Sequence, residues 1–435
     1  MTGAEKQITS DENGHILTNL NVFSPDNEWI VYDQRSDRDG AQFDSTAIKR
    51  VNVHNGRVET LYQSKSGAYV GVVTYNPKKD SVVFIHGPES PTADWSYAGH
   101  HREGSIVDIA KPGVARNLDA RDITAPFTPG ALRGGSHVHI YAPDGEWLSF
   151  TYQDHVMNVL GRVPGHDLDQ RNVGISVPVR SVTVNNDHKR NRDGTTFTVL
   201  ATRTVNAPKP GSDEVNRAYE EGWVGSQGYV KPDGTRQRRA IGFLGDTLDS
   251  AGKKLIEVFI ADIPEDITQS DAGASIEGTA TQLPAPPKGV TQRRLTFTGD
   301  RKNPGIQGPR FWVRSNAAGD SLAFLMKDDA GAIQVYTVSP NGGPIRQVTR
   351  NAFSVDSTFS WSPDGKRIAY TGDDSVFVTD VASGITSRVA PKDPGRPVLQ
   401  IAADFSHDGK LIAYQRVVKA GASAWNQIFV TELSE

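Results

Sequence analysis

The chain of 435 residues contains no cysteine. This absence excludes a disulfide scaffold, a thiol nucleophile, a cysteine zinc site and an iron–sulfur cluster. No run approaches the ~18 apolar residues that suggest a transmembrane helix. The first residues, MTGAEKQITS, have neither the charged n-region nor the apolar core of a signal peptide. Neither sign of charge dominates, because 47 Lys and Arg face 51 Asp and Glu, which argues against nucleic-acid and polybasic membrane partners.

Several catalytic motifs are also missing. A Gly-x-Ser-x-Gly nucleophile elbow is absent, and so are a P-loop and a Gly-x-Gly-x-x-Gly turn after a strand. These absences argue against an α/β-hydrolase and against nucleotide chemistry. Carboxylates are plentiful but no pair stands out, so a glycosidase with paired carboxylates remains an alternative.

What the chain does have is a repeated turn. A Pro-Asp-Gly turn or a variant of it precedes a short apolar strand, with anchors near residues 25, 77, 143, 232, 317, 363 and 407. Proline presets φ, aspartate caps the turn and glycine takes the position with positive φ. A period near 45 residues, with strands on both sides of each turn, is typical of β-propeller blades.

The two ends of the chain predict how the ring closes. KQITSD at 6–11 resembles the fourth strand of a blade, whereas NQIFVTEL at 426–433 resembles a third strand. We therefore expect an all-β, seven-bladed β-propeller whose N-terminal strand pairs with the C-terminal blade and removes an open sheet edge. The expected organisation is one propeller domain over residues 1–435. An array of small β domains and an eight-bladed ring are the alternatives.

Extra length is concentrated in the middle of the chain. Long loop insertions are predicted at 87–104, 166–176, 206–228 and 270–289. Loops that carry aromatic residues on a rigid scaffold are common places for binding sites. We therefore predict that three aromatic residues of these insertions contact a ligand, namely Trp95, Tyr219 and Trp223.

Histidine is unevenly distributed along the chain. Six of the 11 histidines fall between residues 86 and 155, namely His86, His100, His101, His137, His139 and His155. His137 and His139 occur in GGSHVHIY, the expected inner strand of the third blade, and their i,i+2 spacing predicts that both side chains lie on one face. We expect the six to converge from two neighbouring blades on a functional site.

Long phrases of the chain resemble TolB-type propellers, and within them a bacterial and fungal family that is largely of unknown function. The phrases include FSPDNEWIVYDQRS, TPGALRGGSHVHIYAPDGEWLSFTYQDHV and GSDEVNRAYEEGWVG. Among enzymes the chain resembles the seven-bladed polysaccharide lyases, which include oligogalacturonate lyase and the lyase that removes rhamnose from glucuronate on gum arabic side chains. The resemblance implies β-elimination at C4 of a uronic acid, and a non-catalytic binding propeller is the alternative.

Elimination of this kind needs a base, an acid and a group that neutralises the carboxylate. For proton transfer, the resemblance implies His86, His100, His101, Tyr152 and His155. For the carboxylate, it implies Arg102, Arg133 and Arg310, the last at the expected start of an inner strand of the fifth blade.

Oligogalacturonate lyases resemble one another in a manganese site of three histidines and a glutamine. His137 and His139 match its His-x-His pair, but Gly134 stands where the glutamine would be. The sequence therefore requires no metal and leaves a calcium or manganese ion in the central channel open. The implied partner is a uronic-acid oligosaccharide or polysaccharide, bound by a monomer, with no nucleic acid and no membrane. The implied location is secreted or extracellular, with a cytoplasmic one as the alternative.

Overall fold

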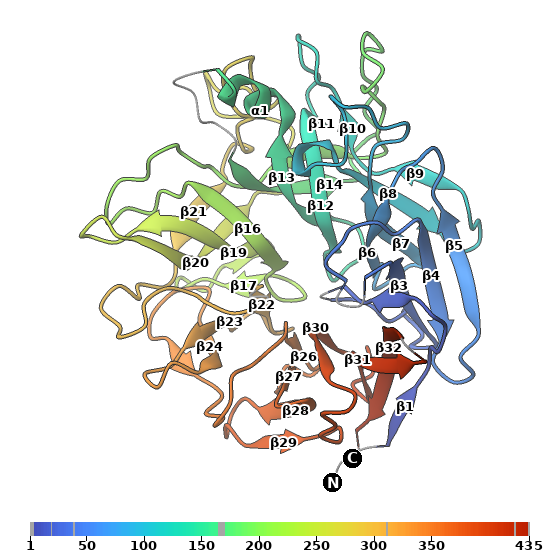
Figure 1. Cartoon of the computed structure of the whole chain (residues 1–435). Helices are drawn as coiled ribbons and strands as arrows, with labels where there is room; N and C mark the ends of the chain where they lie inside the picture. The colour runs from blue at the N-terminus through green and yellow to red at the C-terminus, as the bar shows by residue number, and fades with distance from the viewer. Residues whose placement is uncertain are drawn as a thin grey trace.

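Seven four-stranded antiparallel sheets, the blades, follow one another around a ring in the computed structural model (Figure 1). The structure describes residues 4–18, 20–37, 40–163, 170–309, 312–421 and 423–433. Within these residues, helix is confined to the 3₁₀ turn η1 (Gly99–His101) and to α1 (His155–Gly161). Neither is long and apolar enough to cross a membrane. The prediction of an all-β, seven-bladed propeller is confirmed.

The first three blades each consist of consecutive strands, named from the innermost strand outward. Blade 1 contains β2 (Gly14–Ile16), β3 (Trp29–Arg35), β4 (Ala47–Asn52) and β5 (Val58–Gln63). Blade 2 contains β6 (Val70–Tyr75), β7 (Ser81–His86), β8 (Glu103–Asp108) and β9 (Ala115–Asn117). Blade 3 contains β12 (Gly134–Tyr141), β13 (Leu148–Asp154), β14 (Arg171–Val177) and β15 (Phe197–Leu200). A short parallel pair, β10 (Ala120–Arg121) and β11 (Ala131–Leu132), connects blades 2 and 3.

The remaining blades follow the same order, with one added hairpin and one exchange of strands. Blade 4 contains β16 (Arg217–Trp223), β19 (Arg239–Leu248), β20 (Lys254–Ile263) and β21 (Thr291–Arg294), and the hairpin β17 (Tyr229–Val230) with β18 (Arg236–Gln237) lengthens its first connection. Blade 5 contains β22 (Arg314–Ser315), β23 (Leu322–Lys327), β24 (Ile333–Val338) and β25 (Arg346–Gln347). Blade 6 contains β26 (Ser360–Trp361), β27 (Arg367–Gly372), β28 (Ser375–Asp380) and β29 (Thr386–Arg388). Blade 7 contains β30 (Val398–Phe405), β31 (Leu411–Ala420), β32 (Ser423–Glu432) and the N-terminal β1 (Glu5–Gln7).

The Pro-Asp-Gly turns join the innermost strand of a blade to the second one. In blade 6, Asp364 Oδ1 accepts hydrogen bonds from Ser362 Oγ at 2.5 Å and from Lys366 N at 3.1 Å. Gly365 has φ +69°, in the left-handed region that glycine adopts without a steric cost, and Asn27 takes this position in blade 1. Because neighbouring strands are antiparallel, these turns lie on one face of the ring, the turn face. The connections between second and third strands lie on the other face, the loop face.

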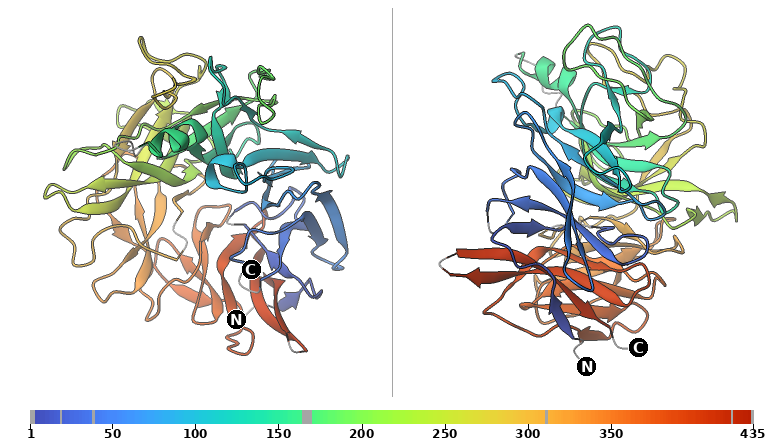
Figure 2. Two further views of the ribbon diagram at one scale, coloured as in Figure 1. Left: turned by 45° about the horizontal axis from the view of Figure 1, so that its top comes forward. Right: turned by 90° about the vertical axis from the view of Figure 1, so that its right-hand side faces the viewer.

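The N-terminal strand closes the ring, as the sequence predicts. β1 is hydrogen-bonded to β32, with Glu5 opposite Thr431 and Gln7 opposite Phe429. Glu5 Oε2 also lies 2.7 Å from Nε of Arg416, a residue of β31 whose side chain is fully buried. Figure 2 shows the blue β1 beside the red strands of blade 7.

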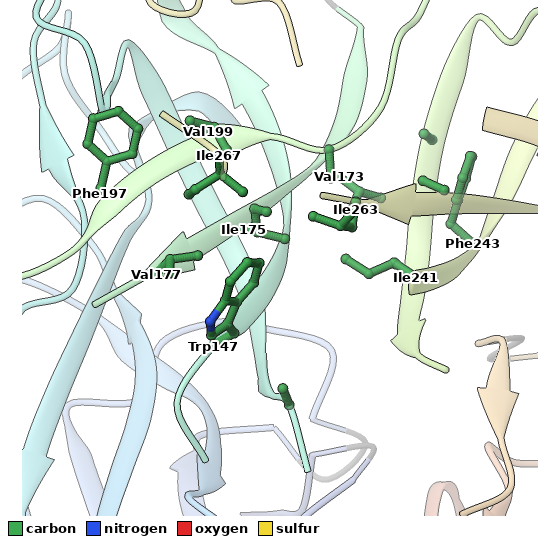
Figure 3. Close-up of a cluster of buried hydrophobic side chains, with 14 of the residues drawn as sticks. Trp147, Val173, Ile175, Val177, Phe197, Val199, Ile241, Phe243, Ile263 and Ile267 are labelled. Carbon is green, nitrogen blue, oxygen red and sulfur yellow. The ribbon is translucent and has the colours of Figure 1, made fainter. Parts of the chain in front are cut away.

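Apolar side chains fill the space between adjacent blades. A large cluster lies between blades 3 and 4, around Trp147, Val173 and Ile241 (Figure 3). Between blades 2 and 3, by contrast, the apolar cluster has five residues, namely Val83, Ile106, Leu118, Tyr141 and Leu148. That interface also buries the polar side chains of Asp119 and His139. The interface between blades 2 and 3 is therefore the one to search for function.

The innermost strands of blades 2, 3 and 4 share an irregularity. The pairing register of each strand shifts once. At the shifts, Val72, Val138 and Glu220 have φ of 54°, 58° and 55°, which is uncommon for residues other than glycine. A β-bulge of this kind inserts one residue into a strand and interrupts the alternation of its side chains.

The bulge at Val138 corrects the expectation for His137 and His139. His137 of β12 lies directly opposite Thr151 of β13, so the two side chains lie on the same face of blade 3. The hydroxyl of Thr151 donates to Glu221 of blade 4, so this face is the one that packs against blade 4. His139 Nε2 lies 3.0 Å from Ser136 Oγ, and a Cβ added to Gly104 of blade 2 would lie 2.8 Å from the same ring nitrogen. The prediction that both histidines share one face is therefore wrong, because the inserted residue turns His139 toward blade 2.

Candidate functional site

Three of the six predicted histidines come together on the loop face, above the interface of blades 2 and 3. His100 and His101 belong to η1 in the insertion after β7, and His155 is the first residue of α1 rather than the end of a strand. Asp154 caps α1 by accepting a hydrogen bond from Met157 N at 2.9 Å. One ring nitrogen from each of His100, His101 and His155 lies within 4.8 Å of the other two. We call these three residues the histidine cluster.

The hydrogen bonds of the cluster set the tautomers of two of its members. His101 Nδ1 lies 2.8 Å from the carbonyl oxygen of Ser96, which only accepts, so Nδ1 carries the proton. In the neutral ring, His101 Nε2 is then the acceptor, and it lies 3.1 Å from His155 Nδ1. His155 therefore donates from Nδ1 and carries its lone pair on Nε2. The indole of Trp95 stacks on the His101 ring with the centroids 3.7 Å apart, which fixes the orientation of that ring.

Burial and surrounding cations keep two members of the cluster neutral. The pKa of His101 is lowered to about 4, by burial first, and the charges of His100, Arg121 and Arg162 act in the same direction. Burial also lowers the pKa of His155 to about 3, together with His101, His100 and the same two arginines. At neutral pH both imidazoles are therefore uncharged, the state in which histidine accepts a proton or binds a metal.

Three arginines lie near the cluster, at or next to the starts of strands on the loop face. Arg102 directly follows η1, Arg171 begins β14 and Arg217 begins β16. Each is partly buried, and the Nε atom of each is buried without a hydrogen-bond partner. The pKa of Arg171 is lowered by burial first, then by the charge of Arg217 and, more weakly, by that of Arg102, while the carboxylate of Glu220 raises it. We call Arg102, Arg171 and Arg217 the arginine group.

Gln153 lies between the histidine cluster and the arginine group. Gln153 of β13 lies directly opposite Arg171 in the ladder of blade 3. A Cβ added to Gly99 of η1 would overlap Oε1 of the same Gln153. Neutral imidazoles therefore lie one side chain away from several cations, an arrangement suited to an anionic ligand that exchanges a proton.

Two residues predicted to act on the substrate lie inside blade 3 instead. Tyr152 is fully buried, and its hydroxyl donates to Asp154 Oδ2 at 2.9 Å. Arg133 is also fully buried, pairs with Asp154 at 2.8 Å and donates to the carbonyl oxygens of Thr279 and Gln282. With these partners, Arg133 and Tyr152 anchor the long connection of blade 4 to blade 3, so their placement argues against the predicted catalytic and binding roles.

The other predicted site residues are dispersed. His86 lies at the outer rim of blade 2, where Tyr62 OH is 3.0 Å from its Nε2. Tyr219 OH donates to Asp246 Oδ1 at 2.6 Å. Trp223 lines a cavity of about 450 Å³ at the turn face, opposite the histidine cluster, and its indole donates to the carbonyl of Ile140 at 3.1 Å. Arg310 lies outside the described residues.

Sequence reasoning missed Arg171 and Arg217. They are 46 residues apart in the sequence and no motif marks either of them. The feature that they share is visible only in the structure: each is the first residue of a strand that starts at the loop face. The candidate metal ligands also differ from those expected. Among the described residues, the group with metal-ligand geometry is the histidine cluster and not His137 with His139.

Comparison with known proteins gives a family and a fold. A family model described as "Protein of unknown function (DUF3748)" matches residues 69–192. The uncharacterized protein YidR of Escherichia coli K12 is 45% identical over 425 residues, which cover 97% of this chain and 96% of YidR. Oligogalacturonate lyase in complex with manganese has a TM-score of 0.54 at 12% identity, over 100% of this chain and 96% of that one. TolB from Acinetobacter baumannii has a TM-score of 0.39 at 11% identity, over 95% of this chain and 65% of that one.

Proposed function

The chain belongs to the family of Escherichia coli YidR, and for it we propose a lyase activity on oligosaccharides that contain a uronic acid. The observation that carries the proposal is the arginine group, whose three partly buried cations lie next to neutral histidines. Guanidinium groups bind carboxylates through charge-assisted hydrogen bonds, and uronic acids are the sugars that carry a carboxylate at C5. The propeller fold shared with oligogalacturonate lyase is consistent with this substrate class and does not by itself assign it.

The proposed reaction is β-elimination at C4 of the uronic acid. The C5–H bond and the C4–O bond break, a C4–C5 double bond forms, and the proton from C5 is balanced by a proton delivered to the leaving oxygen. Arg102, Arg171 and Arg217 would hold the carboxylate and stabilise the negative charge that develops on it. His155 would take the C5 proton on Nε2, because its Nδ1 is committed to His101.

The surroundings of His155 are suited to an anionic substrate. Arg121 and Arg162 contribute to its low pKa, so the free protein holds a weak base. A bound carboxylate adds negative charge beside the ring and raises the proton affinity of His155 when substrate is present. His100, the third member of the cluster, is proposed to protonate the leaving oxygen.

A divalent cation is the competing use of the same histidines. One ring nitrogen from each of His100, His101 and His155 could bind a metal, and a manganese or calcium ion held there would neutralise the substrate carboxylate. The electrostatic field opposes this use, since Arg121 and Arg162 act on the cluster and the described metal-ligand group contains no carboxylate. We therefore propose that the cluster transfers protons without a metal.

The finer proposal for the substrate is a rhamnose linked to C4 of glucuronate, as in plant gum and arabinogalactan side chains. Oligogalacturonide is the second substrate to test. The assay is incubation of the full chain with gum arabic or oligogalacturonides, followed by ultraviolet absorbance for the unsaturated uronate and by a reducing-sugar assay. Absorbance together with new reducing ends supports a lyase, whereas reducing ends without absorbance indicate a glycoside hydrolase.

Matched variants assign the reaction to this site. His155→Ala should lower turnover by about 10²–10⁴-fold, as expected for a lost general base. Arg171→Gln should raise KM by about tenfold and also lower kcat, because the lost contact both holds the carboxylate and stabilises the charge that develops on it. His54→Ala and Arg57→Gln alter exposed residues of blade 1 and should leave both constants unchanged. If neither uronate substrate is cleaved with or without added cations, the lyase proposal is wrong and a binding propeller is the better account.

A further inference from the structure

A second polar cavity lies at the outer rim of blade 2. It has a volume of about 310 Å³ and is bounded by β8, β9 and residues 189–192 of the connection between β14 and β15. We call it the rim pocket. Its wall includes His86, Glu103, Arg121 and Arg192, and the exposed Lys189 lies at its edge. None of its residues touches the substrate in the reaction proposed above, although the charge of Arg121 also acts on His155.

Two guanidinium groups share one carboxylate in this pocket. Glu103 binds Arg121 at 2.5 Å, and its other oxygen binds Arg192. Two further carboxylates act on the pocket: Glu89 lines it, and Asp119 Oδ2 lies 3.7 Å from Arg192 Nη2. Burial raises the pKa of Asp119 to about 6, which leaves it mostly charged at neutral pH. Against these three carboxylates stand four cations, Arg121, Lys189, Arg190 and Arg192. The pocket therefore holds more positive than negative charge.

Several donors of the pocket lack a partner. Three buried nitrogen atoms have no hydrogen-bond partner, namely Nη1 of Arg121 and both Nε and Nη2 of Arg192. The Arg121 side chain as a whole is only 3% exposed. Buried donors without partners cost free energy, and those on charged groups cost the most. Burial also lowers the pKa of Arg192 to about 9, consistent with an under-compensated cation. An anion in the pocket would accept these hydrogen bonds and balance the charge.

Hydrogen bonds to backbone carbonyl oxygens hold the wall of the rim pocket in place. Arg121 Nε donates to the carbonyl oxygen of Arg190 at 2.8 Å. Arg190 in turn donates to the carbonyl oxygens of Glu89 and Ser90 at 2.8 and 3.1 Å. These bonds attach the segment from blade 3 to the insertion of blade 2 and fix the positions of the unpartnered donors.

From this arrangement we propose that the rim pocket binds a small oxyanion, a carboxylate, sulfate or phosphate group, on a molecule about the size of one sugar. The guanidinium donors of Arg121 and Arg192 meet the oxyanion, and Lys189 adds a third cation at the entrance. The volume exceeds that of a free phosphate ion and leaves room for the group that carries the charge. The proposal does not depend on lyase activity and stands or falls separately.

Isothermal titration calorimetry of the full chain tests this site. The probes are inorganic phosphate, D-glucuronate and, as a neutral control, D-glucose. Arg192→Gln should weaken binding of the charged probe about tenfold or more, since a charge-assisted contact is lost. Lys189→Glu, an exposed change that leaves the buried ion pairs intact, should weaken it by about threefold to tenfold. Arg57→Gln, an exposed change in blade 1, is the matched control and should leave this binding unchanged.

Each result has one meaning. Phosphate binding that is weakened by Arg192→Gln and Lys189→Glu but not by Arg57→Gln supports the proposal for a phosphate-type ligand. The same pattern with glucuronate alone supports it for a carboxylate. Binding that Arg192→Gln and Lys189→Glu leave unchanged, or that is absent for both charged probes at millimolar concentration, overturns it.

Discussion

Replacement of Glu5 by glutamine is predicted to destabilise the whole ring. Glu5 comes from the N-terminal strand, yet its carboxylate lies against blade 7, where Oε2 is 2.7 Å from Nε of Arg416. The Arg416 side chain is fully buried, and its other donors bind the carbonyl oxygens of Pro391 and Arg396 at 2.6 and 2.9 Å. Those carbonyls satisfy hydrogen bonds but do not neutralise the charge. Glu5→Gln therefore leaves a buried cation without its anion.

The magnitude follows from the cost of a broken buried ion pair. Removal of one partner typically costs about 3–5 kcal/mol, against a total stability of about 5–15 kcal/mol. A matched control is Glu146→Gln, which removes an exposed ion pair with Lys79 at 2.9 Å. Exposed pairs contribute about 0–1 kcal/mol, so the control should unfold at nearly the wild-type midpoint.

Equilibrium unfolding in urea, followed by the fluorescence of the seven tryptophans, measures the difference. Deletion of residues 1–11 should cost still more, because it also removes the β1–β32 ladder and the hydrogen bond from Ile8 N to Ile428 O at 2.9 Å. Deletion of residues 1–4 leaves β1 in place and should change the midpoint little. If Glu5→Gln and Glu146→Gln unfold at the same urea concentration, the ring is not held at this closure and the reasoning fails.

Three further predictions concern other parts of the molecule. Burial raises the pKa of Asp404 from 3.8 to about 7, so the stability that its neutral form contributes is lost as pH rises from about 4 to 7. In urea unfolding, the stability of Asp404→Asn relative to wild type should therefore increase by about 2–3 kcal/mol between pH 5 and pH 8. A difference that stays constant with pH would contradict this. Gly104→Ala should cost about 1–3 kcal/mol, because its Cβ would lie 2.7 Å from Asp119 Oδ1, and an unchanged melting temperature would refute the tight packing of blades 2 and 3. Extensive chelation should leave uronate cleavage intact, whereas activity that is lost and then restored by manganese would assign the histidine cluster to a metal.

The parts of the fold that sequence predicts are those set by local chemistry. The Pro-Asp-Gly turns, such as Ser362 to Gly365, specify their own geometry through neighbouring side chains, so each blade is recognisable alone. Closure of the ring was predictable because KQITSD resembles the fourth strand of a blade, yet it comes before the first blade in the sequence. The turn near residue 232 closes the hairpin of β17 and β18 inside the first connection of blade 4, so this anchor differs from the others.

The functional surface was predictable only in part. His100, His101 and His155 were found because histidine is rare and their segments are close in sequence. The side-chain directions of His137 and His139 were not predictable, because the bulge at Val138 breaks the two-residue period on which the inference relied. Arg171 and Arg217 resemble any surface arginine in the sequence. Their placement beside Arg102 depends on the ring, which brings the starts of strands in three blades to one place.

The fate of water in the reaction tests the central claim most directly. The full chain is incubated with gum arabic or oligogalacturonides in water enriched in heavy oxygen, and the products are weighed by mass spectrometry. A uronate lyase breaks the C4–O bond without adding water, so the account predicts an unsaturated product that is lighter by one water than the hydrolysis product and carries no label. His155→Ala should abolish that product, while His54→Ala should not. Label at a newly formed reducing end, or no cleavage at all, would contradict the account.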